Sequence, residues 1–258
     1  MKTVVLHNEP TAPDMRQLRD RNLCRPCALN DLCRPLAESG HAALPLERAT
    51  KHSRSLKKGE FLFRVGDPFR AIFLIQSGSV KTSVLSHDGG IQVLRFALPG
   101  ELLGVNAIAS ARHPSDAVAL EATQLCELSF TQLELLATAH PEIQHRLLQL
   151  LSDEIARDER LMAMLGHQKA EVRLAHCLLD FHQRSQRPAQ AGTPFRLPMS
   201  RQDIADYLGL SLETVSRLLS RFQKAGLLQV QGRQLRLLDM AQLRAIGSAG
   251  ALSPARTA

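Results

Sequence analysis

The sequence has no long apolar run that is free of charges. Hydrophobic residues make up 44% of its 258 residues and charged residues 22%, a globular composition. Even so, no uncharged stretch approaches the roughly 18–20 residues that a membrane-spanning helix needs. The stretch from Met1 to Asp20 also lacks the apolar core of a signal peptide. We therefore expect a protein that makes no contact with a membrane and is cytoplasmic, where thiols stay reduced.

The sequence also lacks a recognisable catalytic constellation and a cofactor-binding glycine motif. Several histidines, among them His140, His145, His167 and His182, are scattered over helical patterns, and we interpret them as surface residues rather than ligands. The chain is therefore not expected to be an enzyme. An iron–sulfur redox enzyme is a rival class, but no substrate site supports it.

Five cysteines are an odd number, which argues against a complete disulfide framework. Cys24, Cys27 and Cys33 form a C-x2-C-x5-C pattern, and Cys126 follows 93 residues later. Four such thiolates suit an iron–sulfur cluster, which tolerates irregular spacing and a remote ligand. A zinc site and unligated cysteines stay open as alternatives. Cys177 lies in an apolar helical run, and we expect it to be a buried packing residue.

The net charge of +7 is concentrated in the last third of the chain. Residues 46–166 carry 13 basic and 14 acidic side chains, whereas residues 167–247 carry 12 and 6. A basic C-terminal third on a near-neutral body is typical of a nucleic-acid-binding domain, although a solvated basic face would give the same asymmetry.

Composition divides the chain into five segments. Residues 1–45 are an irregular, cysteine-rich segment that would bind the metal or cluster. In residues 46–140, glycines recur between short β-prone runs, which predicts an antiparallel sandwich or barrel. Residues 141–166 predict one long helix that begins at Pro141. Residues 167–247 predict shorter helices and a small hairpin over 229–237, and residues 248–258 a frayed tail.

The long helix carries an apolar seam with the 3, 4 spacing of a coiled coil. Its members are Leu148, Leu151, Ile155, Asp158, Met162 and Leu165. The alternative is a single helix that packs this face on its own domain. Asp158 argues against that alternative, because an ordinary core excludes a carboxylate. We expect a homodimer held by this seam, in which two copies of Asp158 face each other and make the association marginal.

A helix-turn-helix is predicted after residue 200. Ser200 and Asp203 form the start of a capped helix, Gly209 ends it, and a second helix follows from Leu212. A helical hairpin with a chance polar face is the alternative. On the second helix, the exposed residues suited to reading base edges are Glu213, Ser216 and Arg217. The residues placed to contact phosphates are Arg201, Arg221 and Lys224.

These features together resemble the CRP/FNR superfamily of bacterial transcription regulators, over roughly residues 20–245. The cysteine spacing and the stretch Glu213-Thr214-Val215-Ser216-Arg217 are similar to the oxygen-sensing FNR/ANR branch. The resemblance implies an α+β fold: a jelly-roll-like antiparallel β-roll of the cyclic-nucleotide-binding type, a dimerisation helix and a winged helix-turn-helix. It also implies a [4Fe-4S] cluster on Cys24, Cys27, Cys33 and Cys126, and RNA polymerase as a partner.

One departure concerns the cyclic phosphate that other family members bind. Where they carry an arginine, this sequence reads His113-Pro114-Ser115-Asp116, and Asp116 would repel a phosphate. No cyclic nucleotide is therefore expected. We predict a regulator of the anaerobic response that senses oxygen through the cluster, dimerises and binds a TTGAT-like inverted repeat in double-stranded DNA. The rival is a small-molecule-sensing relative with zinc-bound or unligated cysteines.

Overall fold

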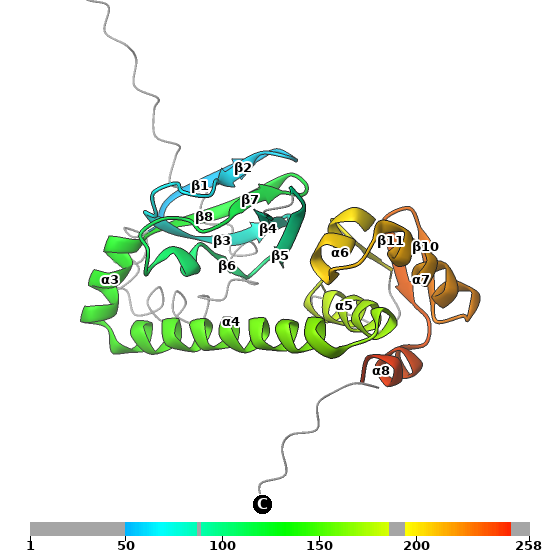
Figure 1. The fold of residues 1–258 in the computed structure, drawn as a ribbon. Helices are drawn as coiled ribbons and strands as arrows, with labels where there is room; N and C mark the ends of the chain where they lie inside the picture. Colours follow the sequence, from blue (N-terminus) through cyan, green and yellow to red (C-terminus); the bar gives the residue numbers. More distant parts are fainter. Residues whose placement is uncertain (1–49, 87–88, 186–193, 249–258) are drawn as a thin grey trace, which may run out of the picture.

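The computed structural model describes residues 50–86, 89–185 and 194–248. Three of the predicted cluster ligands, Cys24, Cys27 and Cys33, lie outside the described residues, as does the end of the predicted tail. The described chain forms an N-terminal β-domain, one long helix and a C-terminal domain of helices with a small sheet (Figure 1). The predicted α+β class is confirmed.

Two antiparallel four-stranded sheets face each other in the β-domain. The first contains, in spatial order, β1 (Thr50–Leu56), β8 (Thr123–Ser129), β3 (Ala71–Ser77) and β6 (Leu102–Leu103). The second contains β2 (Phe61–Phe63), β7 (Asp116–Ala119), β4 (Val80–Leu85) and β5 (Ile91–Ala97). The tight turn after β3 needs a glycine, because Gly78 has φ +84° and a Cβ there would lie 2.5 Å from the carbonyl oxygen of Ala122.

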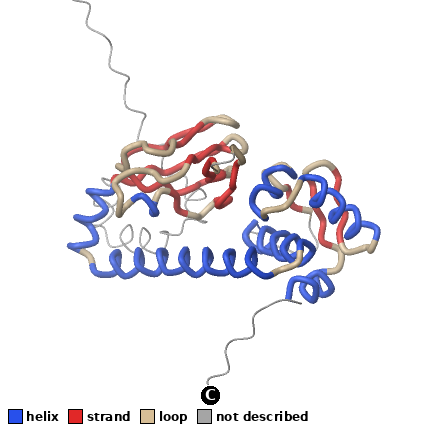
Figure 2. Tube along the Cα trace, viewed as in Figure 1, coloured by secondary structure: helices blue, strands red, loops and turns tan. Residues whose placement is uncertain are grey.

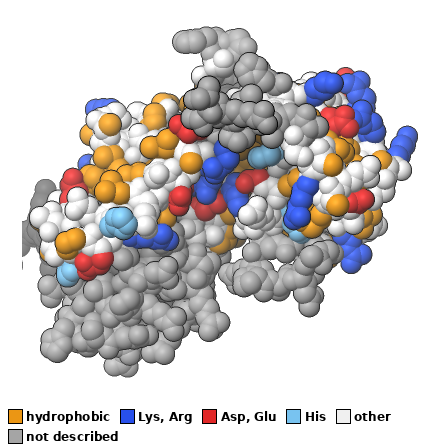
Figure 3. Space-filling model, turned by 90° about the horizontal axis from the view of Figure 1, so that it is seen from below, with side chains coloured by type: hydrophobic (Ala, Val, Ile, Leu, Met, Phe, Trp, Pro, Cys, Tyr) orange, Lys and Arg blue, Asp and Glu red, His pale blue; other side chains and the backbone are white. Residues whose placement is uncertain are grey.

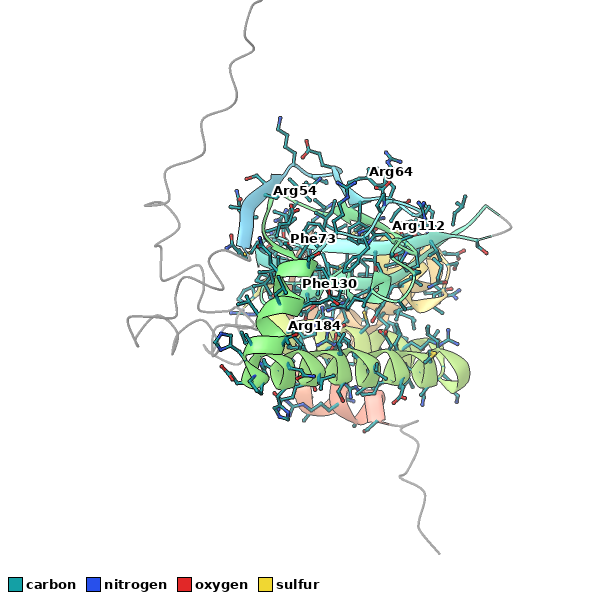
Figure 4. All side chains as sticks on the ribbon, turned by 90° about the vertical axis from the view of Figure 1, so that its left-hand side faces the viewer. Arg54, Arg64, Phe73, Arg112, Phe130 and Arg184 are labelled. Atoms are coloured by element: carbon teal, nitrogen blue, oxygen red, sulfur yellow. The ribbon has the colours of Figure 1, made fainter. Side chains whose placement is uncertain are left out.

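From Ala71 to Ile75 the central strand β3 is buried on both faces, which explains why these five residues are all apolar. Phe73 and Ile75 point between the two sheets. Ile72 and Leu74 point the other way, into a second apolar cluster that includes Leu133 and Ile143 from the neighbouring helices. Phe73 in the β-domain and Phe130 at the start of α3 are labelled in Figure 4. The β-domain is therefore joined to the helices through the outer face of one sheet.

Two helices follow the β-domain. The first, α3 (Phe130–Ala139), leads into α4 (Pro141–His167), whose proline lies in the first turn as predicted. The 27 residues of α4 span ~40 Å, and the helix runs beneath the β-domain to the C-terminal domain (Figure 1). Within the described residues, no helix combines the length and apolarity needed to cross a membrane.

The C-terminal domain packs four helices around a three-stranded sheet, which lies apart from the two sheets of the β-domain (Figure 2). Its helices are α5 (Ala170–Ser185), α6 (Arg201–Leu208), α7 (Leu212–Lys224) and α8 (Met240–Ser248). Its strands are β9 (Phe195–Arg196), β10 (Leu228–Gln231) and β11 (Gln234–Leu237). The predicted hairpin is confirmed as β10–β11, and β9 adds an edge that the sequence did not predict.

The two domains share one hydrophobic core. Phe96 of β5 lies in the same apolar cluster as Leu178 and Phe181 of α5. Its ring makes edge contacts with Phe181 at 5.4 Å and with Tyr207 of α6 at 5.1 Å between centroids. The C-terminal domain consequently packs against the edge strand β5 of the β-domain, in addition to its covalent connection through α4.

Candidate DNA-binding interface and sensor residues

The first helix of the predicted helix-turn-helix, α6, is fixed at both ends. The hydroxyl of Ser200 accepts a hydrogen bond from the Asp203 amide, while the Asp203 carboxylate accepts one from the Ser200 amide at 2.8 Å. This is the capping box that the sequence predicts. At the other end, Gly209 has φ +61°, and Arg173 of α5 donates a hydrogen bond to the Leu208 carbonyl at 2.9 Å. The helix is thereby held against α5.

The second helix, α7, is strongly two-sided. Ser211 caps its start by accepting a hydrogen bond from the Thr214 amide. The buried face is the one predicted from the sequence, and it consists of Val215, Leu218, Leu219 and Phe222. The opposite face is polar and stands away from the core. The helical hairpin therefore has the geometry of a helix-turn-helix, in which the second helix presents its first turns outward.

The three residues assigned to base reading share that outer face. Glu213 and Arg217 are exposed, and Ser216 is partly exposed. The Arg201 guanidinium of α6 lies 3.5 Å from the Ser216 hydroxyl, so the structure brings a predicted phosphate contact beside a predicted base contact. Glu213, in the first turn, and Arg217, one turn later, lie on the same side of the helix.

The three basic residues assigned to phosphates differ in their surroundings. Arg201 and Lys224 line a groove of about 220 Å³ between α7 and the β10–β11 hairpin. Arg221, in contrast, forms an ion pair with Glu171 at the start of α5. A phosphate at Arg221 would therefore compete with a carboxylate of the same chain. Lys and Arg side chains spread over this C-terminal end in Figure 3, at the right.

The hairpin next to this groove is tied to α7 by a contact that the sequence analysis missed. The side-chain oxygen of Gln223 accepts a hydrogen bond from the Val230 amide at 3.2 Å. Gly232 closes the hairpin with φ +62°. The arrangement is that of a wing beside the second helix. A glutamine in the last turn of α7 gave no signal of this role in the sequence.

The apolar seam of α4 faces away from its own domain. Leu148, Ile155 and Met162 are 58%, 60% and 63% exposed, Asp158 is exposed, and Leu151 and Leu165 are partly exposed. The packed side of the helix is a different row, which includes Ile143, Leu147, Leu150, Leu161 and Met164. The alternative in which the seam packs on its own domain is therefore wrong. The exposed seam is unpartnered within the described chain.

Of the predicted cluster ligands, only Cys126 falls within the described residues. It lies on β8, opposite Leu74 of β3 and Ser53 of β1. Its side chain is partly buried and belongs to the apolar cluster under α3 and α4. Cys177 is fully buried in the C-terminal core, and burial raises the pKa of its thiol far above the ordinary value. The prediction that Cys177 is a packing residue is confirmed.

Two histidines are buried among the residues whose burial the structure describes. His182 was interpreted as a surface residue, and this is wrong: the residue is 5% exposed and its ring lies against Phe195. His113 stacks on Phe63 with 3.6 Å between ring centroids. Burial lowers the pKa of both imidazoles. Nearby, Asp116 accepts a hydrogen bond from the Val65 amide at 2.8 Å, so it is engaged in bracing the β-domain.

Comparison with known proteins gives concordant results. A family described as cyclic nucleotide-binding domain matches residues 53–140, and one described as Crp-like helix-turn-helix domain matches residues 172–246. The chain is 39% identical to the transcriptional activator protein anr of Pseudomonas aeruginosa over 86% of this chain and 91% of that protein. It is 37% identical to an anaerobic regulatory protein of Aggregatibacter actinomycetemcomitans, over 85% and 86%.

Among solved structures, FixK2 from Bradyrhizobium japonicum superposes with a TM-score of 0.71 at 33% sequence identity, covering 78% of this chain and 98% of that chain. Since the match includes nearly all of that structure, it extends over the β-domain, the long helix and the helix-turn-helix together.

Proposed function

The chain belongs to the CRP/FNR family of transcription regulators, and from this premise we propose that it is an oxygen-responsive, DNA-binding regulator of the anaerobic response. The observation that carries the proposal is the outer face of α7, where Glu213, Ser216 and Arg217 stand clear of a well-packed core. Related proteins are named as an activator and as an anaerobic regulator, which supports the same physiological setting.

The proposed DNA contacts divide into two kinds. Arg217 is suited to a bidentate bond to guanine O6 and N7, Glu213 to accepting from cytosine N4, and Ser216 to a neighbouring base edge. Arg201, Lys224 and Arg221 would hold phosphates and fix the register without reading sequence. For Arg221, this requires exchange of its partner Glu171 for a phosphate. The proposed target is a TTGAT-like inverted repeat.

We propose that two copies of the chain associate along the seam of α4. Three of its apolar side chains are more than half exposed, and continuous apolar exposure of this kind marks an interaction surface. A parallel pair would place the two copies of Asp158 opposite each other. Because the two carboxylates repel each other, the association is weak, and a modest additional free energy from elsewhere in the protein decides whether the dimer forms.

The proposed cofactor is a [4Fe-4S] cluster on Cys24, Cys27, Cys33 and Cys126. Cys126 fits such a role, because its sulfur lies on a partly accessible sheet face beside apolar side chains, a setting that limits solvent access. Cys177 does not fit, since a ligand must be a thiolate and burial disfavours that form. A bound cluster would supply an oxygen-labile link between the cysteine-rich segment and β8.

The chain itself offers a route from Cys126 to the seam. Cys126 shares an apolar cluster with Leu74 on the adjacent strand β3, and the same cluster contains Ile143, Leu147 and Leu150 of α4. A shift in the position of β8 would therefore be transmitted through these packed side chains to the first half of α4. The seam begins in that half, with Leu148.

The proposal is tested on protein purified without air. We expect iron and acid-labile sulfide in equal amounts, a broad visible band that bleaches in air, and a dimer that becomes monomeric on bleaching. Single changes of Cys24, Cys27, Cys33 or Cys126 to Ser should abolish iron and sulfide binding, whereas the matched control Cys177→Ser should keep both. Zinc without sulfide, or a protein without metal, would support the rival small-molecule sensor.

A further inference from the structure

A group of largely buried charges connects the β-domain, α4 and the DNA-binding domain. Each of these side chains is at most 19% exposed. We call the group the interdomain joint, and its members are Lys81, Arg95, Glu101, Glu154, Arg184 and Asp203. Three positive and three negative charges balance, and the joint was not predicted from the sequence.

Arg184 is the centre of the joint. Its Nε donates to the Glu101 carboxylate at 3.0 Å, and a terminal nitrogen donates to the Phe96 carbonyl at 2.5 Å. The other terminal nitrogen donates to Asp180 of its own helix at 2.9 Å. The residue is labelled in Figure 4. A single guanidinium near the end of α5 thus holds the strand β5 and the turn that follows it.

A second contact holds the first helix of the helix-turn-helix. Lys81 of β4 donates to the Asp203 carboxylate at 2.5 Å, and Gln92 of β5 donates to the Asp206 carbonyl at 2.6 Å. Asp203 also forms the capping box with Ser200, so the same carboxylate starts α6 and anchors it to the β-domain.

The third contact extends to the proposed dimer helix. Arg95 of β5 donates to Glu154 of α4 at 2.9 Å and lies 3.4 Å from Glu101. Glu154 directly precedes Ile155, a member of the exposed seam. The joint therefore connects the position of α6 and α7 to the helix along which two copies would associate.

We infer that the interdomain joint determines which spacing of DNA half-sites the protein binds. The joint fixes α7 relative to α4 and thereby sets the distance between the two recognition helices of a dimer. The dimer is then selective for one separation of half-sites. This inference rests on the proposed function. A largely buried charge that leaves its partner loses an ion pair and regains only part of its contact with water, so intermediate orientations of the domain are unfavourable. The joint therefore favours one orientation of the DNA-binding domain over a range of them.

Linked binding explains how orientation becomes selectivity. When one recognition helix is bound, the second samples DNA at an effective concentration that is highest where the geometry matches. A rigid joint gives the second recognition helix a high effective concentration at only one half-site spacing, near one helical turn of about 34–36 Å. With a loosened joint, the effective concentration is similar at several spacings, and its highest value is lower.

The experiment uses full-length protein, purified without air, and fluorescent duplexes in which two TTGAT half-sites are separated stepwise by one base pair. A duplex with one half-site measures the intrinsic affinity. The test variant combines Lys81→Gln with Arg184→Gln. The control is Arg244→Gln, which removes an exposed charge from the same domain. Among the described residues, Arg244 forms no hydrogen bond or ion pair with the joint.

We expect the test variant to lose at least tenfold in affinity at the optimal spacing and less than threefold at spacings two base pairs away. Single half-site affinity and the dimer seen by sedimentation should be unchanged, and hydrogen exchange should rise in β5. The control should retain the wild-type profile. A profile as steep as that of the wild type, with the dimer intact, would overturn the inference. Wild-type protein that does not prefer the inverted repeat to a single half-site would overturn the proposed function itself.

Discussion

At the scale of single residues, the proposed DNA complex assigns base recognition and phosphate contact to different side chains of the helix-turn-helix. Arg217 stands on the outer face of α7 beside Ser216 and Glu213, whereas Lys224 lines the groove toward the wing. In the proposed complex, Arg217 would face the base edges. Lys224 would reach a backbone that is the same for every sequence.

Arg217→Ala should therefore cost about 1–3 kcal/mol on the specific site and relax the preference at one guanine. Lys224→Ala should weaken all sequences similarly and reduce the dependence of log affinity on log salt by about one. Both are measured by salt titrations on specific and scrambled duplexes. Equal behaviour of the two variants on the two duplexes would contradict this division.

Asp203 illustrates how one carboxylate can serve two structures. Burial acts to raise its pKa, but hydrogen bonds from Lys81 and Ser200 outweigh burial and hold the pKa below the ordinary value. Because the folded state disfavours protonation, Asp203 contributes stability that is complete above the ordinary pKa of about 4 and is lost as the pH falls through the lower folded value.

Asp203→Asn should accordingly lower the free energy of unfolding at pH 7 by about 1.5–3 kcal/mol, the scale of a hydrogen bond to a charged group. The difference from the wild type should persist down to about pH 5 and shrink below about pH 4. Denaturant unfolding at several pH values measures it. Lys81→Met should reduce the same pH dependence, and a difference that stays constant down to pH 3 would exclude Asp203 as its source.

At the scale of elements, α4 has two faces, one packed on its own chain and one exposed. The inward row packs under the β-domain, and the seam is exposed, although Leu151 and Leu165 are only partly so. Within the described residues, no ion pair neutralises Asp158. At about 4–6 Å and an effective dielectric near 20, two opposed carboxylates repel by on the order of 3–4 kcal/mol before relaxation and screening.

Asp158→Ala should therefore dimerise and bind DNA in air, without the cluster. Ile155→Glu, which places a charge at a seam position that is 60% exposed in the single chain, should stay monomeric even without air. Sedimentation of both variants with and without oxygen is the measurement. An Asp158→Ala protein that is folded but monomeric in air would show that this carboxylate does not set the threshold.

The elements were predictable where the signals are local. Pro141 begins α4, Ser200 caps α6 and Gly209 ends it, all by interactions within a few residues. The short edge strand β9 was missed, because two residues carry no periodic pattern. His182 was placed on the surface, because α5 is buried on more sides than its helical pattern indicates: it packs on α8, and His182 itself lies against Phe195 of β9.

At the scale of the whole molecule, the connection between the domains could not be predicted. Lys81 and Asp203 are separated by 122 positions and Arg184 and Glu101 by 83. Lys81, Glu101 and Arg184 read as ordinary surface charges in the sequence, and Asp203 reads only as part of a helix cap. Their pairing depends on how β5 and α5 meet, which follows from the shared apolar core rather than from any local pattern.

Phe96 is where that shared core can be tested. It is 1% exposed, lies on β5 and contacts Phe181 and Tyr207 of the C-terminal domain. The carbonyl of the same residue accepts the hydrogen bond from Arg184. Loss of this ring removes packing across the domain boundary while leaving the core between the two β-sheets untouched. Phe63, 6% exposed, is a matched aromatic residue of that inner core, where it stacks on His113.

Both Phe96→Ala and Phe63→Ala should cost about 3–5 kcal/mol, as expected for a buried ring. Their unfolding should nevertheless differ. If the shared core makes the two domains unfold together, the wild type and Phe63→Ala should each show one calorimetric transition, because Phe63→Ala weakens one domain without loosening its contact with the other. Phe96→Ala should show two transitions, since each domain then loses the stability that it draws from its neighbour. A single transition in Phe96→Ala, lowered as in Phe63→Ala, would mean that α4 and the joint couple the domains without the aromatic contact.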